Sequence, residues 1–269
     1  MPEPSTRNCI FCGVGKLTRE HEWAQWLHPY LKTGEMGFVR SELRDNTTGQ
    51  LHYDRIYPGS ILDKTLKTVC SACNNGWMSR LQTRAKPYII ALLKDEDIIL
   101  DAEAQGIVAS WAVMFSIVAY TRSGNDLIPF LERITFSETQ RPNMNWRAWI
   151  GRYHGTMSAP QRYIISFGIE NDYGPLEPRG QTKFVQTTII LGHCIIQTLF
   201  VDPHELYIDH IFYGVLQMLL PLAAWSVPRL RRSSICVTDK HLPHVIHFLS
   251  QQVGNEMGDR LDKKLIYEG

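Results

Sequence analysis

The sequence has no uninterrupted apolar run long enough to cross a lipid bilayer. Its longest apolar runs, 107–120 and 211–225, are shorter than the roughly 20 residues that a bilayer core requires, and the second contains Gln217 and Pro221. Residues 1–8 lack the apolar stretch of a secretory signal. These absences predict a cytoplasmic protein that has no membrane partner.

The chain also lacks the phosphate-binding loop, the dinucleotide fingerprint and the serine-nucleophile motif that mark several common enzyme classes. Internal repeats and low-complexity segments are absent too. Its 269 residues are 44% hydrophobic, 10% aromatic and 20% charged, which excludes disordered and fibrous proteins. This length and composition predict one large or two modest globular domains.

The formal net charge is only +1 at pH 7, but the charge is unevenly distributed. Residues 1–94 contain 13 Lys and Arg against 8 Asp and Glu, whereas the rest contains 15 against 19. The segment 64–94 has six basic residues and no acidic one. A basic segment of this kind is typical of a phosphate-binding surface, and equally of a solvated helix face.

The six cysteines are Cys9, Cys12, Cys70, Cys73, Cys194 and Cys236. The first four form two Cys-x-x-Cys pairs, and two such pairs together complete a tetrahedral zinc site. A redox Cys-x-x-Cys motif would need only one pair, and disulfides are rare in the cytoplasm. The sequence therefore predicts a structural Zn²⁺ ion on these four thiolates. The last two cysteines lie in apolar stretches and are predicted to be core residues.

Two further motifs follow the cysteine pairs. Glu20 and His21 come shortly after the first pair, and Asn74 and Asn75 come directly after the second. In this combination residues 8–86 resemble the HNH endonucleases, which are built on a zinc-stapled ββα-metal core. The resemblance implies cleavage of DNA phosphodiester bonds and a catalytic Mg²⁺ or Mn²⁺ ion beside the structural zinc.

The resemblance also implies the role of each residue. His21 matches the general base that activates water, a task suited to a pKa near neutral pH. Glu20 matches the acidic metal ligand, and Asn74 or Asn75 matches the second ligand, since hard divalent ions prefer oxygen. Taken one by one, these motifs could instead be a helix-capping histidine with solvated acids, and an asparagine turn or N-cap.

The sequence departs from the family pattern in two places. Many relatives have Asp at the position of Glu20. The Asn that usually precedes the second cysteine pair is missing from 64–68, so Asn75, Asp63 or a threonine would have to orient the base.

A helix is predicted over 74–86, ending where Pro87 stops it. Arg80 and Arg84 are four residues apart and share one face of this helix. Together with Lys86, they are the candidate DNA-binding residues that would contact the phosphate backbone. Between the cysteine pairs, residues 38–57 are predicted to form an inserted hairpin with its turn at 45–49.

The rest of the chain predicts an α+β domain with an antiparallel sheet that has one solvent-facing side. A strongly apolar helix is expected over 100–122. Strands are expected over 146–150, 162–167, 183–191 and 193–201, with a hairpin turn at 191–193, and helices over 209–220 and 242–253. Three histidines, His241, His244 and His247, spread over too wide an arc of a helix to bind one ion.

The sequence thus predicts an α+β protein with two domains, a zinc-stapled ββα-metal nuclease module (1–87) and a larger α+β domain (88–269). The second domain would position DNA, bind a partner protein or form a homodimer. The expected activity is that of an HNH endonuclease, and relatives of this kind include phage-defence proteins. The alternatives are a catalytically inactive zinc-knuckle protein that binds nucleic acid, and an RNase.

Overall fold

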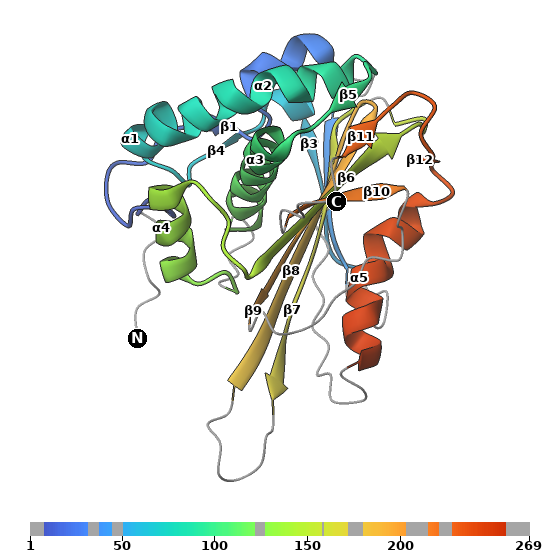
Figure 1. Cartoon of the computed structure of the whole chain (residues 1–269). Helices are drawn as coiled ribbons and strands as arrows, with labels where there is room; N and C mark the ends of the chain where they lie inside the picture. Colours follow the sequence, from blue (N-terminus) through green and yellow to red (C-terminus); the bar gives the residue numbers. More distant parts are fainter. Residues whose placement is uncertain are drawn as a thin grey trace.

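The computed structural model describes residues 8–31, 38–44, 51–121, 127–157, 159–171, 180–202, 215–220 and 228–256. It has helices together with antiparallel and mixed sheets, which confirms the α+β class (Figure 1). We call the described residues from 8 to 93 the cysteine module, and those from 98 to 256 the sheet region.

The cysteine module is built from very short strands and one long helix. Strand β1 (Glu20–His21) pairs antiparallel with β4 (Thr65–Leu66), and the helical segments α1 (Ser71–Cys73), η3 (Asn74–Met78) and α2 (Ser79–Leu93) follow. The chain between β1 and β4 contains the helical turns η1 (Gln25–Tyr30) and η2 (Ile61–Asp63). It also contains the hairpin of β2 (Phe38–Arg44) and β3 (Leu51–Pro58), which confirms the inserted hairpin. The expected turn at 45–49 lies outside the described residues.

The prediction that this helix ends at Pro87 is wrong. Helix α2 continues through Pro87 to Leu93, so the expected domain boundary at residue 87 falls inside a helix. Pro87 lies on the exposed side, while Ala85, Ile89 and Leu92 are fully buried on the opposite side. Burial of this apolar face compensates for the backbone hydrogen bond that proline cannot donate.

A six-stranded sheet forms the centre of the sheet region (Figure 1). Its strands run in the order β10-β6-β9-β8-β7, and β12 adds in parallel to β6. Their bounds are β6 (Trp146–Tyr153), β7 (Gln161–Asn171), β8 (Gly180–Leu191), β9 (Cys194–Asp202), β10 (Leu216–Leu220) and β12 (Cys236–Val237). The four predicted strands and the hairpin turn at Gly192, whose φ is +51°, are confirmed.

The helix predicted over 209–220 is wrong where the structure describes it. Residues 216–220 form β10, which pairs antiparallel with the edge of β6. A short apolar run suits a helix or a buried strand equally well, and here the unpaired edge of β6 determines the outcome. Residues 209–214 lie outside the described part of the chain.

Helices cover both faces of the sheet. Helix α3 (Ala102–Thr121) packs on one face and α5 (Leu242–Glu256) on the other, as Figure 1 shows. The helices expected over 100–122 and 242–253 are thereby confirmed. By length and composition α3 could cross a membrane, but 78% of its most apolar window is buried inside the protein, as in a core helix.

The expectation of one solvent-facing side of the sheet is wrong. Gln186, Thr188 and Gln197 are buried beneath α5. Gln186 Nε2 donates to the carbonyl oxygen of Ile246 at 2.7 Å, and Gln197 Nε2 donates to that of Val245 at 2.7 Å. The polar side chains that suggested a wet face instead satisfy hydrogen bonds under a helix.

Two smaller elements complete the fold. Strand β5 (Ile98–Ile99) pairs with β11 (Arg229–Leu230) within the sheet region. Helix α4 (Phe130–Thr139) joins the two regions, since its Phe136 ring packs against Trp77. A single cluster of buried hydrophobic residues extends from Cys9 to Leu230. The cysteine module and the α3 face of the sheet therefore share one core.

Candidate functional site

The four cysteines of the two pairs lie together, as the sequence predicts. Their Sγ atoms are all within 4.8 Å of one another, and Cys12 Sγ lies 3.6 Å from Cys70 Sγ. Zinc–sulfur bonds of about 2.3 Å in a tetrahedron place neighbouring sulfurs about 3.8 Å apart. The cluster, Cys9, Cys12, Cys70 and Cys73, could hold a metal ion such as zinc. Cys194, in contrast, is buried in the core as expected, and Cys236 is half-buried.

Local backbone contacts hold the two pairs in place. Gly15 has a φ of +91°, and a Cβ atom there would lie 2.9 Å from Cys70 Cβ, so only glycine fits. Leu17 forms a backbone bridge to Cys70, which is also the N-cap of α1. The Phe11 ring packs edge-on against Trp77, with 4.9 Å between ring centroids. The first pair is thus fixed against the start of the helix that carries the second.

The thiols of the cluster differ in acidity. Burial raises the pKa of Cys12 and of Cys73. At Cys70 burial also acts to raise the pKa, but hydrogen bonds from the Cys73 amide and the neighbouring thiols outweigh it and lower the pKa to about 7. Because metal ligands must be thiolates, binding of a metal ion here would release protons.

Glu20 and Asn74, 54 residues apart in the chain, are in direct contact. The Nδ2 atom of Asn74 donates a hydrogen bond to Oε1 of Glu20. Partial burial raises the pKa of Glu20, although hydrogen bonds from Asn74 and Thr18 act against this shift. The pairing of β1 with β4 positions Glu20, and the start of the helix positions Asn74.

Asn75 contacts Asn74 and Ser71. Its Nδ2 donates to Ser71 Oγ at 3.0 Å, and its Oδ1 accepts from Asn74 Nδ2 at 3.4 Å. The helical turn at this point is widened to a π-type turn, with a non-helical Gly76, a distortion often found at functional sites. Because Cys70 is the helix N-cap, the alternative that Asn74 serves as an N-cap is wrong.

His21 lies next to Glu20 on β1. Both residues line a cavity of about 40 Å³ between β1, the α2 segment and α3. The His21 ring packs edge-on against His28, with 5.6 Å between ring centroids, and His28 Nε2 donates to the Trp23 carbonyl at 3.2 Å. His28 was missed by sequence reasoning because only the fold of η1 brings it to His21.

No asparagine stands opposite His21 on β4, because its register partner there is Thr65. Asp63, another candidate for the missing orienting residue, is exposed. Thr65 and His28 are thus the residues that the structure places beside His21.

The three basic candidates, all on α2, differ in their contacts. Arg80 is exposed, whereas Arg84 Nη2 lies 3.4 Å from Glu103 Oε1 in an exposed ion pair. The Lys86 ammonium lies over the Trp26 ring, 5.9 Å from its centroid. Only Arg80, among the three, has an exposed side chain without such a contact in the described interactions.

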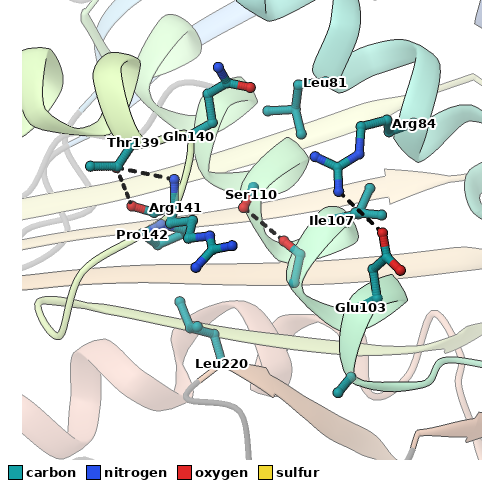
Figure 2. A pocket seen from close by; sticks show the side chains of 12 residues that line it. Leu81, Arg84, Glu103, Ile107, Ser110, Thr139, Gln140, Arg141, Pro142 and Leu220 are labelled. Atoms are coloured by element: carbon teal, nitrogen blue, oxygen red, sulfur yellow. Dashed lines mark hydrogen bonds and ion pairs between the residues drawn. The ribbon is translucent and has the colours of Figure 1, made fainter.

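A pocket of about 470 Å³ lies beside Arg84, between α2, α3 and the end of α4. Figure 2 shows Arg84 on one side of this pocket and Arg141 on the other. Glu103 pairs with Arg84 at the rim, and Ser110 lies on the α3 wall. The pocket thus brings basic and acidic side chains to one surface near the start of α2.

An ion-pair network lies directly beside the site. Glu22, one residue after His21, is almost fully buried and pairs with Arg162 on β7 and with Lys64 at 3.5 Å. Sequence reasoning missed this network because its members come from three separate parts of the chain. It ties β1 to the sheet region.

Comparison of the chain with protein-family models, with curated proteins and with solved structures gives no match.

Proposed function

We propose that this protein is a divalent-metal-dependent endonuclease of the HNH type, as the resemblance of residues 8–86 implies. The observation that carries the proposal is the contact of Glu20 with Asn74. An acidic residue on a short strand meets an amide at the start of the next helix, directly beside a four-cysteine cluster. A carboxylate and a side-chain amide in contact would supply two oxygen ligands for Mg²⁺ or Mn²⁺ once the amide turns its oxygen toward the carboxylate.

The residues divide the chemistry between them. Glu20 and Asn74 would hold the divalent ion, with Asn74 presenting its amide oxygen where its nitrogen now contacts Glu20. When bound, such an ion stabilises the negative charge that develops on a phosphate. His21 would take the proton from the attacking water, and the packing of His28 against its ring would fix its position.

The basic surface supports nucleic acid as the substrate. Arg80 is exposed on α2, six residues after the proposed metal ligand Asn74, where it would contact the phosphate backbone. Arg84 would join it by exchanging Glu103 for phosphate. Residues 88–269 would position the DNA, bind a partner or form a homodimer, in a cytoplasmic protein.

A nucleic-acid-binding protein without catalysis is the second candidate. Two observations favour it: Thr65 stands where an orienting asparagine would be expected, and the amide nitrogen of Asn74 faces Glu20. The cysteine cluster and the basic residues would serve such a protein equally well.

The test is a nicking assay on supercoiled plasmid with Mg²⁺, Mn²⁺ or EDTA, together with a structured RNA to examine the RNase alternative. Cleavage that requires the metal and is lost in His21→Ala supports the proposal. His244→Ala, which changes an exposed histidine on α5, is the matched control and should cut like wild type. Binding without cleavage under all metal conditions would establish the second candidate.

A further inference from the structure

A second group of metal-ligating side chains lies where the sheet region meets the end of α2, away from the cysteines. The ligand atoms of Asp95, His154 and His193 all lie within 4.8 Å of one another. His154 Nε2 is 3.5 Å from Asp95 Oδ1, and the two imidazole rings are perpendicular with centroids 5.5 Å apart. Two ligands at about 2.0–2.1 Å from a tetrahedral zinc ion stand roughly 3.3 Å apart, close to the spacing seen here.

Three different segments bring these side chains together. Asp95 follows the end of α2, His154 follows β6, and His193 lies in the turn between β8 and β9. The Tyr153 amide donates to the His193 carbonyl at 2.9 Å, which fixes the two histidine segments side by side. A Cβ atom on Gly192 would lie 3.2 Å from Leu93, so the turn packs closely against the end of α2.

Asp95 is held in an uncommon conformation. Its φ is +59°, and it occupies the position after α2 at which glycine usually ends a helix. The hydrogen bonds of a Schellman motif are present, from the Asp95 amide to Leu92 and from the Glu96 amide to Ala91. An aspartate at this position is less favourable for the backbone than glycine. A contact of its carboxylate would offset this cost.

Arg152 orients the Asp95 carboxylate from the protein interior. Arg152 is fully buried, and its Nη1 donates to Asp95 Oδ1 at 2.8 Å while Nη2 donates to the Leu230 carbonyl at 2.8 Å. A carboxylate has about four lone-pair positions, and metal-ligating carboxylates are commonly hydrogen-bonded from behind in this way. Neutralising Arg152 would need only Asp95 and does not account for His154 and His193, both exposed, whose ligand atoms lie within 4.8 Å of the same carboxylate.

The surrounding charges are mixed. Arg232 Nε lies 3.6 Å from Asp95 Oδ2, but its side chain is exposed, and its amide donates to Asp97 Oδ1 at 2.7 Å. Glu96 and Asp97 add negative charge beside Asp95. The site is therefore neither strongly attractive nor strongly repulsive toward a cation.

We propose that Asp95, His154 and His193 form a second metal site, which binds one divalent transition-metal ion such as Zn²⁺. Two imidazoles and one carboxylate favour zinc, copper, nickel or iron over Mg²⁺ and Ca²⁺. The exposure of both histidines leaves room for solvent to complete the coordination. The proposal is independent of the nuclease function and of the cysteine cluster.

The test counts metal ions on the full-length protein. Wild type, His154→Ala/His193→Ala and the control His241→Ala/His244→Ala are titrated with Zn²⁺ by calorimetry and with Co²⁺ by absorption. We expect the first variant to bind one equivalent fewer than wild type and the control to match wild type. Since changes to outer partners alone weaken metal binding by about 10–100-fold, loss of two ligands should weaken it by at least about 100-fold.

Cobalt separates the two sites, because thiolate charge-transfer bands report only the cysteine cluster. The extra equivalent in wild type should add visible absorption without further thiolate bands. Asn tolerates the left-handed conformation, so the Asp95→Asn variant should fold normally. It should weaken binding of the same extra metal equivalent, and it controls for misfolding of the double variant. A wild-type protein that binds Zn²⁺ only at its thiolates, or a double variant that keeps the extra equivalent, would overturn the proposal.

Discussion

The cysteine module and the sheet region are stabilised in opposite ways. In the cysteine module the sheet β1–β4 has only two residues in each strand, and the second cysteine pair opens the helix. In the sheet region β8 extends over 12 residues and pairs along its length with two neighbours. The module thus has little hydrogen-bonded sheet around its cysteine cluster, whereas the sheet region has a long hydrogen-bond ladder that is buried on both faces.

The two regions nonetheless meet over a tight apolar contact. The ring centroids of Trp23 and Phe115 lie 4.7 Å apart, and those of Trp26 and Trp111 lie 6.5 Å apart. Both partners are on α3, which also covers the sheet. The cysteine module, which carries the sequence motifs, therefore packs its apolar side chains on the sheet region, which carries no recognised motif.

Loss of the cysteine cluster is expected to have the largest effect. Cys70→Ser should release the bound metal and unfold the module, since structural zinc supplies roughly 10–16 kcal/mol of apparent binding free energy in small domains. Zinc content, far-UV circular dichroism and thermal unfolding measure this. Cys236→Ser, which lies outside the cluster, is the control. A Cys70→Ser protein that unfolds as cooperatively as wild type would show that the module does not need the cross-link.

The next effect concerns chemistry without a change in stability. His21→Ala should reduce the cleavage rate by about 10²–10⁴-fold, because a general base contributes that much. Its zinc content, melting temperature and DNA affinity should remain near wild type. Single-turnover cleavage together with a binding assay distinguishes these quantities.

Glu20→Ala should also lose cleavage, but for a different reason. It would weaken the affinity for the catalytic ion, so raised Mn²⁺ should partly restore its activity and not that of His21→Ala. Asn74→Ala and Asn75→Ala in parallel show which amide matters, and the contact with Glu20 favours Asn74. Equal rescue of the Glu20 and His21 variants would contradict these separate roles.

The buried ion pair between the regions should have a smaller but global effect. Arg162→Met leaves Glu22 buried with Lys64 as its remaining described ion-pair partner, and breaking a buried pair costs about 3–5 kcal/mol. Chemical denaturation should show this loss of unfolding free energy. Glu22→Gln/Arg162→Met should recover much of it, because the buried carboxylate that lost Arg162 is then neutral, and Lys64, whose side chain is 16% exposed, can be solvated. A double variant no more stable than Arg162→Met would mean that packing, not charge, links the regions.

The surface arginines should affect only binding. Arg80→Ala/Arg84→Ala should weaken DNA binding for all sequences alike and reduce the salt dependence by at most about two units of slope. The measurement is DNA affinity over a series of salt concentrations. Arg229→Ala/Arg231→Ala is the matched control, because both arginines are exposed and lie far from α2 in the sequence. A changed sequence preference at constant affinity would place the α2 arginines on base edges.

The smallest expected effect is a pH-dependent one in the sheet region. Hydrogen bonds from the Tyr153 hydroxyl and from the amide and hydroxyl of Thr156 lower the pKa of Asp239. Because its pKa is lower in the folded state, ionised Asp239 stabilises the fold at pH values above its pKa in the unfolded chain, near 3.8. This stabilisation is lost as the pH falls through the folded-state pKa. Asp239→Asn should therefore be less stable than wild type at pH 7, and the difference should shrink below about pH 4. A difference that is independent of pH would assign the effect to geometry alone.

Local sequence signals predicted much of this protein. The spacing of the cysteines predicted their cluster. The resemblance of residues 8–86 to the HNH endonucleases implied that Glu20 and Asn74 lie close together, and the two side chains are in contact. Hydrophobic periodicity placed α3, α5 and the four long strands, since a 3.6-residue or two-residue repeat records which side of an element is buried. The nuclease activity and its catalytic ion stay predictions.

Only the tertiary structure decided the remaining features. Helix α2 continues through Pro87 because its apolar face is packed, and this packing outweighs the local effect of proline. Residues 216–220 form a strand because they pair with an otherwise unpaired edge of β6. The tertiary structure also buried the polar side of the sheet under α5, and it gathered Asp95, His154 and His193 from three turns. Such contacts join residues that are far apart in the chain. The order of residues along the sequence does not show which of them lie close together in the fold.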